Sequence, residues 1–275
     1  MSIEQLFDQI KHLPNVPAVV MALIERFDDE HLHVSDVANN IKKDPNLTLK
    51  VLRLANSTRY GAGRNVASID DAVVILGFDS VRTLVIASGV VGALKVVEGL
   101  DPRQFWRDSF MVASIARLIA RNSPYARTET AFTCGVLHNI GATLMHIAHP
   151  EPMKHIDRQV EKGAEREPLE HDEFGYDYTQ AGAELLRRWR FPEELCIAIA
   201  YQNDPLARTP FSPYAAVLHL ASYLHGCIKD GRREEEAMAH FPSEVRQPLA
   251  LDLLTLYDDI LALMDEKDDI DFLLS

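Results

Sequence analysis

Cysteine is scarce in this sequence. Its three cysteines, Cys134, Cys196 and Cys227, are odd in number and far apart, which argues against a disulfide framework and is typical of a reducing compartment. Each lies in an apolar, helix-like stretch without a neighbouring histidine that would activate the thiol. We therefore interpret all three as small buried hydrophobic residues and expect no cysteine nucleophile.

Long apolar runs are also missing. The longest, residues 84–97, is interrupted by Ser88, Gly89, Gly92 and Lys95, and crossing a bilayer takes roughly 20 apolar residues. The first residues, MSIEQLFDQIKHL, lack the basic start and apolar block of a secretion signal. Taken with the cysteines, these absences predict a cytoplasmic protein that does not bind a membrane.

Positive charge is in the minority. Lys and Arg number 28 against 41 Asp and Glu, which gives a formal net charge of −13 over 275 residues. This charge repels phosphate backbones, so nucleic acid is not an expected partner. One basic group, Arg187, Arg188 and Arg190 beside Trp189, would suit a phosphate or a base, but the exposed edge of an amphipathic helix explains it as well.

Strand-like alternation is nearly absent, and helical spacing takes its place. Val20, Leu23, Ile24 and Phe27 form an i, i+3, i+4 stripe after Pro17, a residue that is favoured in the first turn of a helix. Hydrophobic residues make up 47% of the chain and charged residues 25%, the composition of a globular protein. The sequence therefore predicts an all-α fold.

We place a hinge at residues 99–102, which divides the chain into an N-terminal helical part, residues 1–98, and a second helical part, residues 99–275. Helices of the second part are predicted near residues 105–121, 128–148, 150–163, 179–189, 193–201, 212–228 and 244–264. Pro248 must kink or split the last of these helices.

The glycines do not form a phosphate-binding loop. Neither GxGxxG nor GxxxxGK[ST] occurs, and the pair Gly61 and Gly63 lacks the flanking strand and the third glycine that such a loop needs. No serine lies in a GxSxG motif. Nucleotide binding through those loops and serine-hydrolase chemistry are therefore not predicted.

Histidine is better represented, with 11 residues. His138, His146 and His149 lie on one predicted helix, and His138 and His149 would be roughly 16 Å apart along its axis, too far to share one ion. His146 and His149 would suit half a metal site, but we favour an interaction with the negative end of the helix dipole before Pro150. The other histidines, His225 among them, have no partner at ligand spacing.

Four segments carry a family resemblance. They are residues 13–17 (LPNVP), 41–57 (IKKDPNLTLKVLRLANS), 68–77 (SIDDAVVILG) and 174–192 (FGYDYTQAGAELLRRWRFP). Together they resemble the HDOD domain, the HD-related output domain of bacterial signalling proteins, over residues 13–205. The second segment is the most specific, and its signature residues are Asp44, Pro45, Arg53, Asn56 and Ser57.

The resemblance implies an all-helical fold with a core like that of HD phosphohydrolases and an added N-terminal helical region. HD hydrolases hold divalent metal with a His, a His-Asp pair, a later Asp and often further histidines. The corresponding positions of this sequence hold Asp108, His138, Asn139, Tyr178, Gln202, Asn203 and Ser222.

These replacements remove most of the metal ligands. Asn, Gln and Ser are neutral and weak donors to such ions, and a tyrosine is ordinarily protonated at neutral pH. Asp108 and His138 alone are too few to hold the metal that would activate a water molecule. We therefore predict a vestigial site without a metal or other cofactor, closed by hydrogen bonds among these side chains.

The function that we predict is a non-catalytic signal-transduction module. It would bind an unidentified signalling protein in trans, since no receiver, kinase or cyclase segment is present, or a small ligand. The alternative is a metal-dependent phosphohydrolase acting on a nucleotide or phosphate ester, with Asp172, Asp177 or Asp204 as further ligands. The acidic segment 265–274 ends in an apolar cluster, and we interpret it as a helix end rather than a docking tail.

Overall fold

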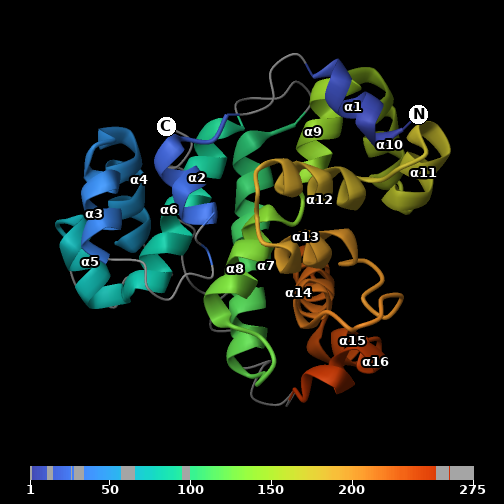
Figure 1. The fold of residues 1–275 in the computed structure, drawn as a ribbon. Coiled ribbons are helices and arrows are strands. Elements are labelled where there is room, and N and C mark those ends of the chain that lie inside the picture. The colour runs from blue at the N-terminus through green and yellow to red at the C-terminus, as the bar shows by residue number, and fades with distance from the viewer. Residues whose placement is uncertain are drawn as a thin grey trace.

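The computed structural model describes residues 2–10, 15–25, 27, 34–56, 66–94, 100–251 and 260. Within these ranges every regular element is a helix (Figure 1), which confirms the all-α prediction. None of these helices combines the length and the hydropathy that spanning a bilayer requires. The signature residue Ser57 and the acidic segment 265–274 lie outside the described residues.

Six of the described helices precede residue 98. They are α1 (Ile3–Gln9), α2 (Ala18–Glu25), α3 (Val34–Lys42), α4 (Pro45–Ala55), α5 (Ile69–Leu76) and α6 (Phe78–Ala93). Figure 1 shows α3, α4 and α5 grouped at one side of the molecule. The apolar helix α6 packs against α2, α4 and α5 and also against the second half of the chain.

The second half begins with α7 (Pro102–Arg121) and α8 (Thr128–Leu137), which form the central pair in Figure 1. The chain continues through α9 (Ile140–Ala148), α10 (Pro150–Val160), α11 (Arg166–Phe174), α12 (Tyr178–Arg188), α13 (Glu193–Ala200) and α14 (Pro213–Lys229). The last described elements are α15 (Glu234–Ala239), α16 (Ser243–Arg246) and the 3-10 turn η1 (Gln247–Leu249). Pro248 lies in that turn, at the point where the sequence predicts a break.

Helix α1 lies apart from the other N-terminal helices. It packs against α9, and the guanidinium of Arg188 lies 4.1 Å from the centre of the Phe7 ring. The first helix of the chain therefore contacts the second half directly. The division at residue 98 falls in a stretch outside the described residues and stays a prediction.

The signature residues of the second segment build local structure. Asp44 accepts hydrogen bonds from the backbone N–H groups of Asn46 and Leu47 at 3.1 and 3.0 Å and so caps α4, whose first residue is Pro45. The Asn56 amide donates to the Val66 carbonyl and accepts from the Val66 N–H, each at 2.8 Å. Asn56 therefore ties the end of α4 to the chain that leads into α5.

The predicted helix over residues 128–148 is in fact two helices, α8 and α9. Nδ1 of His138 lies 2.7 Å from the Gly135 carbonyl, the acceptor that the Asn139 amide would use in a continuous helix. Asn139 takes φ −111° and ψ 14° instead of helical values. The prediction that His138 and His149 lie on one helix is therefore wrong, because the chain changes direction between the two residues.

Helix α9 then packs against α12 at very short range. A Cβ atom added at Gly141 would collide with backbone atoms of Tyr178 and Gly182. Glycine at 141 is therefore what lets the start of α9 touch the start of α12, which brings the α8–α9 turn next to Tyr178.

This packing predicts that Gly141→Ala lowers the free energy of unfolding by about 1–3 kcal/mol, since the backbone of α12 must move to admit the methyl group. Urea denaturation followed by circular dichroism measures the loss. Gly226→Ala in α14 is the matched control: a Cβ there meets no atom within 4 Å, so it should be neutral or stabilising. Equal losses in the two variants would contradict the close contact.

Candidate functional site

The positions that correspond to HD metal ligands lie on five parts of the fold. Asp108 is on α7, His138 and Asn139 form the α8–α9 turn, and Tyr178 is the first residue of α12. The two amide residues at 202 and 203 follow α13, and Ser222 is on α14. Their polar contacts show which of these side chains are engaged within the chain.

His138 is held as a neutral imidazole. Its Nδ1 faces the Gly135 carbonyl at 2.7 Å and must donate, because a carbonyl oxygen only accepts. Burial lowers the pKa of His138 to about 4, against the opposing effect of that hydrogen bond. This leaves Nε2 as the nitrogen with a lone pair, a tautomer that is also found in metal-ligating histidines.

Gln202 and Asn203 are occupied by contacts within the chain. The Gln202 side chain is 1% exposed, and its amide donates to the carbonyls of His138 at 2.8 Å and Ile199 at 3.1 Å. The Asn203 amide nitrogen donates to the Tyr178 hydroxyl at 2.9 Å. Burial raises the pKa of Tyr178, so its hydroxyl keeps its proton and does not serve as a phenolate ligand.

Asp108 is paired with basic residues of α14. Its carboxylate lies 2.8 Å from Nζ of Lys229, 3.4 Å from Nε2 of His225 and 2.8 Å from the Gln104 amide. Burial opposes ionisation, but the hydrogen bonds from His225 and Lys229 prevail and lower the pKa of Asp108 to about 2. Asp108 therefore neutralises the Lys229 ammonium of its own chain.

His225 and Lys229 are not among the predicted site residues. Ser222, one turn earlier on α14, is the residue predicted to face the site, and His225 is predicted to have no partner at ligand spacing. The signal available was the i, i+4 spacing of two basic residues on one helix. That spacing cannot show which residue of α7 they would meet.

The expected cluster of mutually bonded side chains is only partly formed. The side chains of Tyr178 and Asn203 bond to each other, Gln202 bonds to backbone, and Asp108 bonds to residues outside the predicted set. Within the part of the chain that the structure describes, no three His, Cys, Asp or Glu residues lie close enough to hold a metal ion. The donors at these positions therefore do not fit the divalent metal of an HD hydrolase.

The three aspartates considered as further ligands do not complete the set. Asp172 and Asp204 are exposed. Asp177 caps α12, where its Oδ1 accepts from the N–H groups of Thr179 and Gln180 at 2.8 and 3.0 Å.

His146 and His149 do not form half a metal site. His146 lies 2.8 Å from both the Ala142 carbonyl and an Asp157 carboxylate oxygen. His149 instead bonds the Tyr176 hydroxyl at 3.1 Å and stacks on another ring of the core, that of Phe174.

The basic group near Trp189 is neutralised within the chain. Arg187, Arg188 and Arg190 each lie within 3.1 Å of a glutamate carboxylate: Glu193, Glu184 and Glu25, respectively.

A family model for the HDOD domain matches residues 13–205, so this chain belongs to the HDOD domain family. Among solved structures it is similar to a protein of Shewanella amazonensis described as a "putative phosphohydrolase". The two share 35% identity and a TM-score of 0.82, over 94% of this chain and 93% of the other.

An HDOD domain protein of unknown function from Geobacter sulfurreducens is also similar, at 25% identity and a TM-score of 0.75, covering 99% of this chain and 91% of that one. A "putative signal transduction protein" of Marinobacter aquaeolei has 25% identity and a TM-score of 0.78, over 95% and 62% of the two chains. A curated relative, an uncharacterized protein of Treponema pallidum, is 25% identical over 220 residues. This match covers 78% of the chain and 42% of the relative, so the chain spans less than half of that protein.

The pairing of Asp108 predicts a pH-dependent contribution to stability. Its pKa is lower in the folded than in the unfolded chain, so the stabilisation is present above about pH 4 and is lost as the pH falls towards 2. Asp108→Asn should lower the free energy of unfolding by about 1 kcal/mol near neutral pH and by less at about pH 3.

Urea denaturation at the two pH values measures the difference. Asp230→Asn is the control, because Asp230 forms an exposed ion pair with Arg232 near the end of the same helix and should contribute little. A loss for Asp108→Asn that is the same at both pH values would contradict the assignment.

Proposed function

We propose that this HDOD-family protein is a non-catalytic signal-transduction module, which acts by binding an unidentified signalling protein in trans. The observation that carries the proposal is the state of the former ligand positions. Gln202, Asn203 and Tyr178 are engaged in hydrogen bonds within the chain, and Asp108 is paired with Lys229. Without a group of anionic or imidazole donors, no metal-bound water of lowered pKa would be formed.

A protein is a better-supported partner for this module than nucleic acid or a membrane. The net charge of −13 disfavours polyanions, and the arginines at 187, 188 and 190 already meet glutamates. Large apolar side chains are exposed on several helices and loops: Leu49, Val74, Tyr125, Ile147, Tyr201 and Leu206.

We place the protein in the bacterial cytoplasm, where its three free, buried cysteines would stay reduced. A small ligand is a further class of partner for the same module.

The alternative function is a metal-dependent phosphohydrolase. Two observations favour it: the description of the Shewanella relative at 35% identity, and the orientation of His138, whose Nδ1 hydrogen bond leaves Nε2 available. The proposal of a non-catalytic module therefore needs a direct test against catalysis.

We predict that Asn139→Asp alone creates no phosphatase activity, because the restored carboxylate would join one free imidazole and not a complete ligand set. Release of phosphate from p-nitrophenyl phosphate and from nucleotides, with Mn²⁺ or Mg²⁺ added, measures this. The unaltered protein should likewise be inactive and should carry less than about a tenth of an equivalent of Mn, Fe, Zn, Ni or Mg after dialysis. Hydrolysis that is abolished by His138→Ala would favour the alternative.

Partner binding is tested by affinity capture from a bacterial lysate followed by direct binding to the purified captured protein. We expect the binding to weaken by about tenfold or more when a glutamate replaces a central contact residue such as Val74 or Leu206. Ala164→Glu adds the same charge at an exposed position without removing a large apolar side chain. Binding that no exposed apolar position affects would argue against a defined protein interface.

A further inference from the structure

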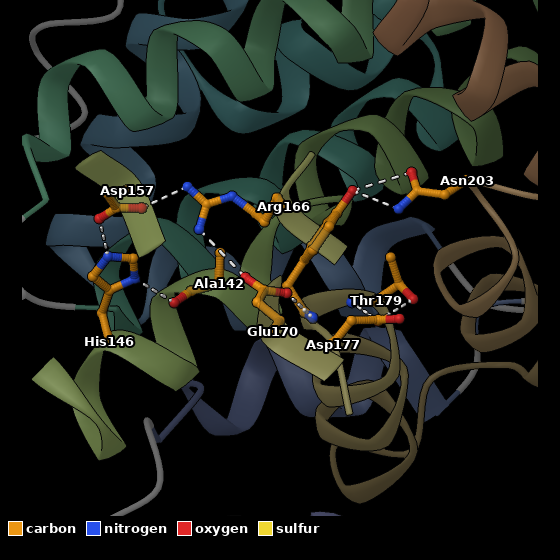
Figure 2. A network of polar contacts seen from close by, with 9 residues as sticks. Ala142, His146, Asp157, Arg166, Glu170, Asp177, Thr179 and Asn203 are labelled. Carbon is orange, nitrogen blue, oxygen red and sulfur yellow. Dashed lines mark hydrogen bonds and ion pairs between the residues drawn. The ribbon is translucent and has the colours of Figure 1, made fainter. Parts of the chain in front are cut away.

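A chain of polar contacts crosses four helices beside the vestigial site. Figure 2 shows it running from His146 on α9 to Asp157 on α10, and then through Arg166 and Glu170 on α11. It ends where a Glu170 oxygen accepts the backbone N–H of Tyr178, at the start of α12, at 2.8 Å. These polar contacts thus join the α10–α11 hairpin, residues 150–174, to α9 and α12, the two helices that border the vestigial site.

The His146 end of this set of contacts is centred on the Asp157 carboxylate, which meets both His146 and Arg166. Both ring nitrogens face oxygen atoms at 2.8 Å, the Ala142 carbonyl and the Asp157 carboxylate. The carbonyl cannot donate, so its contact needs a proton on Nδ1. Burial opposes ionisation of Asp157, but the hydrogen bonds from His146 and Arg166 prevail and lower its pKa.

The Glu170 end is less well compensated. The Glu170 side chain has no exposed surface, and its nearest cation, Arg166, is 3.3 Å away while the same guanidinium lies 2.5 Å from Asp157. Burial therefore raises the pKa of Glu170 to about 6, although the Tyr178 N–H and Arg166 act in the opposite direction. The titratable and charged groups that face this carboxyl, directly or through one neighbour, are Arg166, Asp157, His146, Tyr176, Asp177, Tyr178, His171 and Glu167.

We propose that Glu170 is the titrating member of a proton-sensitive latch that holds the α10–α11 hairpin on α12. The closed hairpin buries Glu170, whereas an opened hairpin exposes it to water. Because a buried carboxyl is held more easily as the neutral acid, proton uptake at Glu170 tightens the closed form and proton release loosens it. The latch regulates how firmly the hairpin is attached and does not depend on which partner the module binds.

Two other groups titrate beside Glu170: Glu167 on α11, whose pKa burial also raises, in the same sense, and His149 in the opposite sense. His149, directly before α10, bonds the Tyr176 hydroxyl, and burial lowers its pKa. Proton uptake by His149 therefore favours opening. The contribution of Glu170 has to be isolated as a difference between the protein and a variant that lacks only its titration.

Hydrogen exchange of backbone amides provides the test, because it measures local opening. Protection factors of α10 and α11 are compared at about pH 5.5 and about pH 7.5 in the unaltered protein and in Glu170→Gln, which keeps an acceptor for the Tyr178 N–H but cannot ionise. The ratio of protection, low pH to high pH, should be about fourfold larger in the unaltered protein than in Glu170→Gln. Glu161→Gln, an exposed carboxylate at the end of α10, should leave that ratio unchanged.

A second variant guards against a Glu170→Gln protein that fails to fold. Arg166→Gln removes the cation that favours ionised Glu170, so the midpoint of the pH-dependent change should move to higher pH. A ratio that is the same with and without Glu170, or a midpoint unmoved in Arg166→Gln, would overturn the proposal. An equal pH effect on the amides of α7 and α8 would also overturn it, since that would report unfolding of the whole domain and not release of the hairpin.

Discussion

The hydrogen bond from the His138 ring to the Gly135 carbonyl is the contact on which the vestigial site depends. The same carbonyl also accepts the His138 backbone N–H at 3.5 Å, as in a tightened last turn, and here α8 ends and the chain turns into α9. The turn leaves the His138 carbonyl available to Gln202 and sets Gly141 against the backbone of α12. A single side-chain contact thus determines where several of the former ligand positions meet.

The replacements at those positions share one physical consequence. A metal site concentrates anionic and imidazole donors around a cation, whereas amide and phenol groups satisfy one another by hydrogen bonds without an ion. The Tyr178–Asn203 pair illustrates the second situation. Asp108, which remains anionic, meets an ammonium group of the same chain. Hydrogen bonds within the chain therefore engage the Tyr178 hydroxyl and the amide nitrogens of Gln202 and Asn203 without an ion.

Two residues of the strongest family signature, Asp44 and Asn56, serve the fold and not this site. Asp44 caps a helix and Asn56 ties two chain segments together, both on the N-terminal side of the molecule. The polar chain from His146 to Glu170 carries no comparable signature, although it joins the hairpin to the core. A conspicuous motif can thus have a purely structural role, and a buried network can be formed by residues that stand out in no local pattern.

The helical fold, the break near Pro248 and the family could be predicted from the sequence by itself, because the residues that carry each of these signals lie within a few positions of one another. Only the tertiary structure decided that Lys229 meets Asp108 across 121 residues of sequence and that the helix predicted over residues 128–148 breaks at His138. It likewise decided that His146 belongs to a buried network and not to a metal site. Such contacts follow from the directions in which helices pack, and the spacing of residues along one helix does not contain that information.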